Sequence, residues 1–140
     1  MGGNDILDGG AGTDDLFGGP GKDVLIGGSG ADFFHYNALS DSGITAGTRD
    51  LIADFEQGSD VIDISFIDAN TTNAAGTNDD FNFIGTNTPF TGTPGQLHAF
   101  WSAIGQIIEG DVNGDKKPDF SIEIKDPTHA ITLASTDFVL

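Results

Sequence analysis

Cysteine is absent from this chain of 140 residues, and basic residues are scarce. Without cysteine the chain can form no disulfide, so a small extracellular fold needs another cross-link. Five lysines and arginines against 22 acidic residues give a net charge of −17, which disfavours binding to nucleic acids and to anionic membranes. No apolar run is long enough to span a membrane, and no basic start leads into an apolar segment, so we expect no membrane insertion.

The acidic residues are nearly all aspartates, because only Glu56, Glu109 and Glu123 are glutamates. Aspartate and glycine are poor helix formers that favour turns, so the composition points away from a helical protein. Oxygen ligands without cysteine favour a hard cation, calcium ahead of zinc. The length suits one domain, and the 11 phenylalanines can supply its core.

A nine-residue repeat, G-G-x-G-x-D-x-U-x with U a large apolar residue, runs through residues 1–34. Its aspartates are Asp5, Asp14, Asp23 and Asp32. Its apolar residues are Leu7, Leu16, Leu25 and Phe34. The glycines allow positive φ angles and close approach of neighbouring segments, and the last three residues of each unit predict a short strand with U facing inward. One unit cannot bury U alone, so the units are expected to stack into a parallel β-roll.

Two successive units are expected to complete one coil of the roll, which stacks Asp5 on Asp23 and Asp14 on Asp32. Stacked carboxylates repel one another, and a cation between them reverses the sign of the interaction. Carbonyl oxygens of the turns would then bring the coordination number to the six or more that calcium prefers. The competing interpretation, a disordered Gly/Asp linker, does not explain why the apolar residues keep the same interval.

After Phe33 the glycines thin out and segments with strand character follow. Ile62, Ile64 and Phe66 alternate with less apolar positions, and Phe120, Ile122 and Ile124 share one face of another strand. Further strands are expected in "FNFIG", "GQLHAFW", "IGQIIEGDV" and "ITLASTDFVL". The fold class expected is therefore all-β, with a parallel β-roll in residues 1–41 that continues into an antiparallel β-sandwich-like cap in residues 42–140, as one structural unit.

The repeat resembles the nonapeptide of repeat-in-toxin (RTX) proteins, which binds calcium. The segments "GGSGADFFHYNALSDS" and "RDLIADFEQGSDVIDIS" and the ending "DFVL" resemble the C-terminal domain of the serralysin family of secreted metalloproteases. Other hydrolases exported by type I secretion share this module. The resemblance implies a calcium-binding module of a secreted parent enzyme, with a fold that closes on calcium outside the cell.

The resemblance also implies which residues hold calcium, two or three ions in all. The first site would use Met1, Gly3 and Asp5 with Gly18, Pro20 and Asp23. The second would use Gly10, Gly12 and Asp14 with Gly27, Ser29 and Asp32. A third would use Gly19, Gly21 and Asp23 again, with the segment around Ala38 and Asp41. Asp41 and then Asp50 continue the interval of nine, although the glycines have been lost there.

The last four residues, Asp137, Phe138, Val139 and Leu140, match the export signal that the resemblance implies, an acidic residue followed by three apolar ones. The partner would be the type I secretion machinery, and the location extracellular. A plainer interpretation is that Phe138 to Leu140 finish an edge strand, and both can hold because the signal is read before folding.

The segment "GDVNGDKKPDF" carries a second series of oxygen ligands. Asp111, Asn113, Asp115 and Asp119 fall at positions 1, 3, 5 and 9 of an EF-hand-like loop. The glycine usual at position 6 is Lys116, and the glutamate usual at position 12 is Ile122. A polar hairpin loop built from turn residues is the favoured interpretation, with a second type of calcium loop as the alternative.

No catalytic pattern is present. The three histidines are isolated, no HExxH or GxSxG motif occurs, and there is no cysteine nucleophile. The chain is therefore expected to be non-catalytic and to serve the N-terminal catalytic domain of a parent hydrolase. The alternatives are a polysaccharide-binding module, as in alginate epimerases, with Tyr36 and Trp101 as a sugar platform, or a segment of an RTX adhesin. The end of the roll near Leu7 is expected to be uncapped, so that two chains could associate there as a dimer.

Overall fold

The computed structural model describes residues 2–73 and 76–140, and in these residues the regular elements are strands and two short 3-10 helices. The strands that form the roll are β1 (Ile6–Ala11), β2 (Asp15–Phe17), β3 (Val24–Ser29), β4 (Phe33–His35), β5 (Asp50–Ile52) and β6 (Val61–Asp63). The remaining strands are β7 (Asn82–Thr86), β8 (Gln96–Trp101), β9 (Gly105–Asp111), β10 (Phe120–Lys125) and β11 (Phe138–Val139). The 3-10 helices are η1 (Leu39–Asp41) and η2 (Ser135–Asp137).

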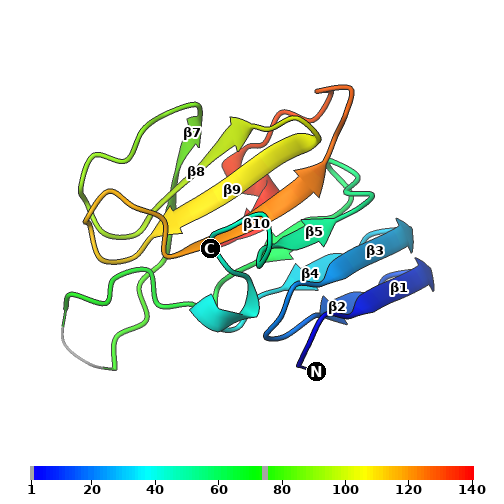
Figure 1. Ribbon diagram of the computed structural model, residues 1–140, viewed down its shortest axis with the longest axis horizontal. Helices are drawn as coiled ribbons and strands as arrows, with labels where there is room; N and C mark the ends of the chain where they lie inside the picture. The colour runs from blue at the N-terminus through cyan, green and yellow to red at the C-terminus, as the bar shows by residue number, and fades with distance from the viewer. Residues whose placement is uncertain (1, 74–75) are drawn as a thin grey trace.

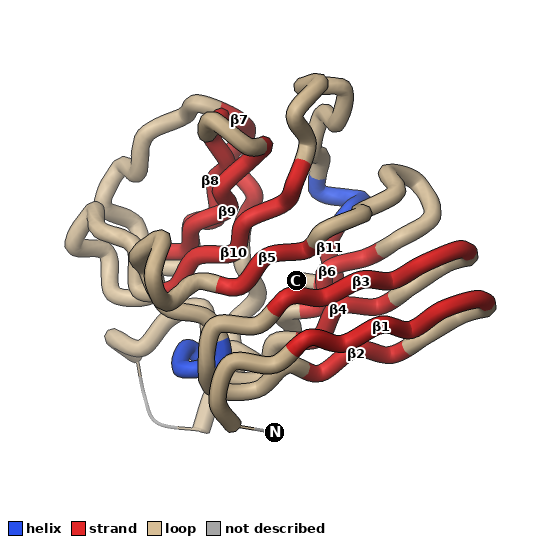
Figure 2. Tube along the Cα trace, turned by 45° about the vertical axis from the view of Figure 1, so that its right-hand side comes forward, coloured by secondary structure: helices blue, strands red, loops and turns tan. Residues whose placement is uncertain are grey.

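The strands form two sheets (Figure 1). The larger sheet has the order β1-β3-β5-β10-β9-β8-β7, and the smaller one has the order β11-β6-β4-β2. Figure 2 shows strands of the two sheets lying in pairs, β1 with β2 and β3 with β4, one pair above the other. We call β1 and β2 the first coil, β3 and β4 the second, and β5 and β6 the third.

The first two coils confirm the expected repeat. Ile6 pairs with Val24 in the larger sheet and Asp15 pairs with Phe33 in the smaller sheet, and both pairings are parallel. In each pair the two partners are separated by two nonapeptides, so one coil is two repeat units, as the spacing predicts. Strands β2 and β4 have three residues each, as predicted, whereas β1 and β3 have six each and include the glycine pairs that were expected to lie in turns.

The third coil is longer than the repeat predicts. Val24 pairs with Leu51, which lies three nonapeptides further along the chain, and Phe33 pairs with Val61, which lies one position beyond that interval. Residues 37–49, which include η1 and a turn, lie between β4 and β5 and take up the extra length. The expected continuation of the interval through Asp41 is therefore wrong, because Asp50 lies in register with Asp23 instead.

The core follows the apolar positions of the repeat into the cap. Leu25 and Phe34 are fully buried, and Leu16 is nearly so, which confirms that these residues face inward. Phe120, Ile122 and Ile124 are buried as predicted. The expectation for Phe66 is wrong: its side chain is 69% exposed whereas Ile67 is 4% exposed, because β6 ends at Asp63 and the turn that follows reverses the alternation.

The cap is a continuation of the larger sheet. Strand β10 pairs in parallel with β5 and antiparallel with β9, and β9 pairs antiparallel with β8. The roll and the cap therefore share one sheet and one core. The segment "ITLASTDFVL" is only partly a strand, because Ile131 and Thr132 bond to the side chains of Gln106 and Gln57 before β11 begins.

Candidate metal centre

Two ladders of aspartates run along the two sides of the roll. The carboxylate of Asp23 accepts the backbone N–H of Asp5 at 2.8 Å, and the carboxylate of Asp50 accepts that of Asp23 at 2.7 Å. On the other side, Asp32 accepts the N–H of Asp14 at 3.0 Å, and Asp60 accepts that of Asp32 at 3.1 Å. Each aspartate thus fixes the coil before it, and the expected stacking of Asp5 with Asp23 and of Asp14 with Asp32 is observed.

One carboxylate oxygen remains on each of five ladder residues. These five Oδ2 atoms are buried and accept no hydrogen bond from the described residues. They belong to Asp5, Asp14, Asp23, Asp32 and Asp50. A buried carboxylate oxygen without a partner is costly unless a proton or a cation meets it. Burial, reinforced by the charge of Asp23 nearby, raises the pKa of Asp50 to about 7. The ladders therefore concentrate negative charge, and at Asp50 the nearby Lys22 offsets only part of the rise in pKa.

The glycines of the repeat bring carbonyl oxygens close to the next coil. A Cβ at Gly28 or Gly30 would lie 1.9 or 1.8 Å from the carbonyl oxygens of Gly10 or Gly12. A Cβ at Gly27 would lie 2.5 Å from Oδ2 of Asp32. Only glycine can stand at these positions while the loops stay stacked, because any side chain would fill the space around the carboxylate and the carbonyls.

This donor set fits calcium. Among the described residues no three His, Asp or Glu side chains converge on one point, so a cation on a ladder would meet two carboxylates and would complete its shell with carbonyl oxygens. Of the glycines predicted as carbonyl ligands, Gly3 and Gly12 lie in the loops before Asp5 and Asp14, whereas Gly10 lies in β1. The carbonyls of Pro20 and Ser29 already accept the N–H groups of Gly3 and Gly12 at 2.9 Å, so each has one partner besides any ion.

The predicted site residues differ in how the structure places them. Gly18, Gly19 and Gly21 lie in the loop before Asp23, as expected, whereas Gly27 lies in β3. Met1 lies outside the described residues. Asp41 is not on a ladder: its Oδ2 accepts the N–H groups of Asn37 and Ala38 at 2.9 and 3.1 Å and closes its own turn. Asp60 is a ladder residue that sequence reasoning missed, because the longer third coil moves it off the interval of nine.

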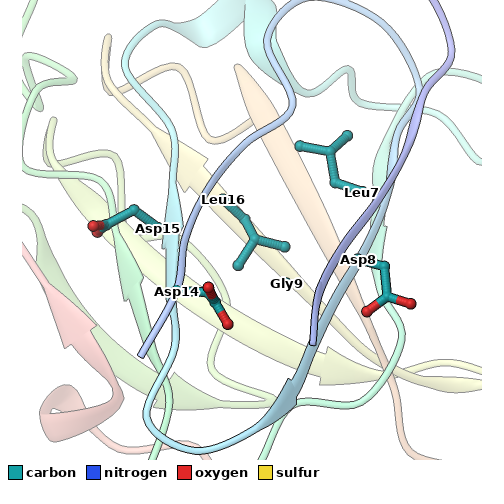
Figure 3. Close-up of a pocket in the computed structure, with 6 residues that line it drawn as sticks. All are labelled: Leu7, Asp8, Gly9, Asp14, Asp15 and Leu16. Atoms are coloured by element: carbon teal, nitrogen blue, oxygen red, sulfur yellow. The ribbon is translucent and has the colours of Figure 1, made fainter. Parts of the chain in front are cut away.

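The roll is open at the first coil (Figure 3). Leu7 and Leu16 point toward one another from β1 and β2, while Asp8 and Asp15 point outward. With Gly9 and Asp14 these residues line a pocket of about 350 Å³. Within the described residues nothing pairs with the outer edges of β1 and β2, which end the two sheets. A dimer through this end stays a prediction.

The loop between β9 and β10 is closed by its own hydrogen bonds. Asp111 is buried, and its carboxylate accepts the N–H groups of Asn113, Gly114 and Lys116 at 3.2, 2.6 and 2.9 Å. Asp119 accepts the N–H of Val112 at 2.9 Å. Asn113 and Asp115 likewise accept backbone N–H groups of the loop. These bonds fit the polar hairpin loop, and metal binding there stays a prediction.

The C-terminal residues are part of the fold. Asp137 is buried and accepts the N–H of Ala134 at 2.8 Å, and Phe138 packs against Phe83 with ring centroids 5.2 Å apart. The N–H of Ile64 donates to the carbonyl of Val139 at 3.0 Å, which places β11 beside β6. The edge-strand interpretation is therefore observed, and the export signal stays a prediction.

Tyr36 cannot be a sugar platform, because it is 2% exposed. Burial raises its pKa well above the ordinary value, and the neighbouring Asp50 adds to the shift. Trp101 is half-buried and packs edge-on against His129.

No helix in the described residues is long and apolar enough to cross a membrane.

Comparisons with known proteins agree with this architecture. Residues 1–140 match the family model of the peptidase M10 serralysin C-terminal domain. The solution structure of the AlgE6R3 subunit of the Azotobacter vinelandii mannuronan C5-epimerase is similar in fold, with a TM-score of 0.57 and 23% identity over 98% of this chain and 78% of that chain. The AlgE6R2 subunit of the same enzyme gives a TM-score of 0.43 and 22% identity over 99% of this chain and 91% of that chain. No curated protein matches the chain.

Proposed function

Since the chain belongs to the family of peptidase M10 serralysin C-terminal domains, we propose that it is a calcium-driven folding switch in a secreted parent hydrolase. This family is an RTX-type module and not the catalytic domain. The observation that carries this proposal is the pair of aspartate ladders, in which five buried carboxylate oxygens accept no hydrogen bond from the described residues. The parent is proposed to be a serralysin-like protease, and the catalytic groups belong to its other part.

Calcium, when bound, supplies the positive charge and the oxygen-seeking coordination that two stacked carboxylates need. The chain's own residues do the rest. Asp23 and Asp32 hold the first coil through its backbone N–H groups, and the glycines let the carbonyls approach. Without a counter-charge the net charge of −17 opposes closure of the roll. Binding free energy therefore becomes folding free energy.

The proposed setting is export from a calcium-poor cytosol to a medium where calcium is about millimolar. Extracellular modules bind calcium with dissociation constants of roughly 10⁻⁴–10⁻³ M, so the roll would stay open inside and close outside. The ions would take the place of the disulfides that the sequence lacks.

The first test is a calcium titration of chelated protein, followed by far-UV circular dichroism, with magnesium as the control. We expect a transition to β-structure with calcium and none with magnesium, because magnesium demands a smaller octahedral shell and gives up its waters reluctantly. A β spectrum that is the same in chelator and in calcium would overturn the proposal. A shift of a soluble polysaccharide in a gel, at an ionic strength of physiological order, would favour the alternative of a polysaccharide-binding module.

The carboxylate of Asp14 is expected to be essential for calcium affinity. Asp14→Asn keeps the size of the side chain but removes the charge that a cation would meet, so the calcium midpoint should rise at least about tenfold. Asp8→Asn is the matched control, since Asp8 lies on the same coil but points outward and is exposed. Equal midpoints for the two variants, measured by the same titration, would exclude Asp14 as a ligand.

We also propose that Asp137–Leu140 are read as an export signal before the chain folds. Val139 allows a test that separates export from stability, because its side chain is 41% exposed. Val139→Asp should reduce secretion through a type I exporter by about tenfold and leave the urea midpoint nearly unchanged, since exposed substitutions usually cost little. Phe66→Asp, at another exposed apolar residue, is the control and should be secreted normally. Normal secretion of Val139→Asp would remove the support for this signal.

A further inference from the structure

The two aspartate ladders end differently at the third coil. Asp50 keeps a buried Oδ2 that accepts no hydrogen bond from the described residues, like the ladder residues below it. Asp60 does not: its Oδ1 accepts the N–H of Asp32 at 3.1 Å, and its Oδ2 accepts the N–H of Glu56 at 2.8 Å. Both oxygens of Asp60 therefore have a backbone donor, whereas Asp14 and Asp32 on the same ladder keep an Oδ2 without one.

The carbonyl that an ion would use at this step has a side-chain donor from the third coil. In the repeat, Gly30 stands in the loop of Asp32 where Gly12 stands in the loop of Asp14. The hydroxyl of Ser59 donates to the carbonyl of Gly30 at 2.6 Å. A serine hydroxyl from the third coil thus donates to the carbonyl oxygen that corresponds to a predicted ligand of the first coil, Gly12.

The backbone N–H groups of the same loop have partners as well. The carboxylate of Asp54 accepts the N–H of Gly27 and the N–H of Gly28, each at 2.9 Å. Asp54 would add a further negative charge if it turned toward an ion, but its two oxygens are engaged with the backbone. The loop of Gly27–Asp32 is therefore held to residues 54–60 by three side chains of the protein.

We propose that the step between Asp32 and Asp60 takes no calcium, and that Ser59, Asp54 and Asp60 close it in place of an ion. This inference rests on the proposed function, because it concerns the same ladders. Asp60, which follows Asp14 and Asp32 on the ladder, would then hold the coils together through hydrogen bonds and would not bind calcium. The third coil would then stay joined to the second coil and to the cap when calcium is removed, and these parts would offer the first coil a formed surface on which to close.

Two backbone amides give a matched pair of probes for this proposal. The N–H of Phe33 donates to the carbonyl of Asp14 at 2.8 Å, across the step between the first two coils. The N–H of Val61 donates to the carbonyl of Asp32 at 2.9 Å, across the proposed calcium-free step. Hydrogen exchange of the full chain in excess chelator, at a pH near neutral, should leave Val61 at least about tenfold more protected than Phe33.

The outcomes separate this inference from the proposed function. Loss of protection at both amides would overturn the inference and leave the calcium switch standing. Protection retained at both would overturn the calcium switch, while the step at Val61 would still be shown to close without calcium. Protection retained at Val61 and lost at Phe33 supports both the inference and the calcium switch.

Two substitutions sharpen the test. Ser59→Ala should reduce the protection of Val61 in chelator by about threefold to tenfold, the effect of one lost hydrogen bond, whereas Ser29→Ala, at an exposed serine of the second coil, should not. By titration calorimetry, Asp32→Asn should lower the number of calcium ions bound and Asp60→Asn should leave it unchanged. A fall in calcium stoichiometry for a folded Asp60→Asn variant would overturn the proposal, and Ser59→Ala keeps it testable if that variant does not fold.

Discussion

Asp23 and Asp32 of the repeat are each placed to serve two coils at once. One oxygen of Asp23 accepts the backbone N–H of Asp5 from the coil before, and the other is buried without a partner among the described residues. A carboxylate has enough lone pairs for both tasks, which an amide or a hydroxyl could not combine with a negative charge. This dual use explains why the aspartate, and not only the glycine, keeps the interval of nine.

The close approach between coils can be measured with a pair of glycines. Gly12 and Gly30 both have positive φ angles, +124° and +133°, but a Cβ at Gly30 would lie 1.8 Å from the carbonyl oxygen of Gly12, whereas one at Gly12 would meet nothing within 4 Å. Gly12→Ala should cost about 1–2 kcal/mol from backbone conformation alone. Gly30→Ala should cost clearly more, because the loops must also separate.

Urea unfolding in saturating calcium checks this prediction, with the calcium midpoint as a second readout. Since both substitutions carry the same conformational penalty, the difference between them reports the contact between the coils. Equal free energies of unfolding would mean that the loops are not stacked as described.

At the scale of elements, one histidine of the cap holds the loop between β7 and β8 against the sheet. Nδ1 of His98 on β8 donates to the carbonyl of Thr88 at 2.6 Å, and Nε2 lies 3.3 Å from Oε2 of Glu109 on β9. The ring of Phe90 stacks on the imidazole with centroids 4.0 Å apart. Burial lowers the pKa of His98, but the bonds to Glu109 and Thr88 outweigh it, so the pKa is raised from its ordinary value of 6.5.

This arrangement predicts a pH dependence of the cap. A histidine whose pKa is raised by folding contributes its stability fully below the unfolded value and loses it as the pH rises through the folded value. The free energy of unfolding in calcium should therefore fall by about 1 kcal/mol between roughly pH 6 and pH 8, the size of one charge-assisted hydrogen bond. His98→Gln should remove this fall, and His129→Gln, at an exposed histidine, should keep it. An unchanged profile for His98→Gln would show that the histidine does not titrate in this range.

At the scale of the whole molecule, one sheet joins the roll to the cap, so the two parts share a core. Strand β5 pairs with β3 on one side and with β10 on the other. The first coil is the exception, since its outer edges pair with nothing in the described part of the chain. Stability should therefore decrease from the cap toward the first coil, and calcium should matter most where the sheet has fewest neighbours.

Small-angle X-ray scattering tests this gradient. A folded chain of 140 residues should have a radius of gyration of about 14 Å, and a fully unfolded one about 39 Å. In calcium we expect the folded value, and in chelator an intermediate one, because the cap, the third coil and the second coil stay together while the first coil opens. A value in chelator near that of the unfolded chain would mean that the cap also depends on calcium.

The repeating part of this protein could be predicted from its sequence alone. The interval of nine places Leu16, Leu25 and Phe34 inside, stacks Asp5 on Asp23 and Asp14 on Asp32, and requires glycine between them. These features are predictable because each depends on a local period that repeats without change. The alternation of Phe120, Ile122 and Ile124 was predictable for the same reason.

Where the nine-residue interval is broken, the positions of the residues in the fold depend on tertiary contacts. The segment of residues 37–49 can be accommodated in several ways, and burial of β5 between β3 and β10 selects Asp50 over Asp41 as the ladder residue. The roles of Ser59 and Asp54 depend on contacts with Gly27, Gly28 and Gly30, far away in the chain, which no local pattern encodes. The exposure of Phe66 likewise follows from where β6 stops. Pairing across coils of unequal length is set by the burial and hydrogen bonding of the whole fold, and not by any single stretch of sequence.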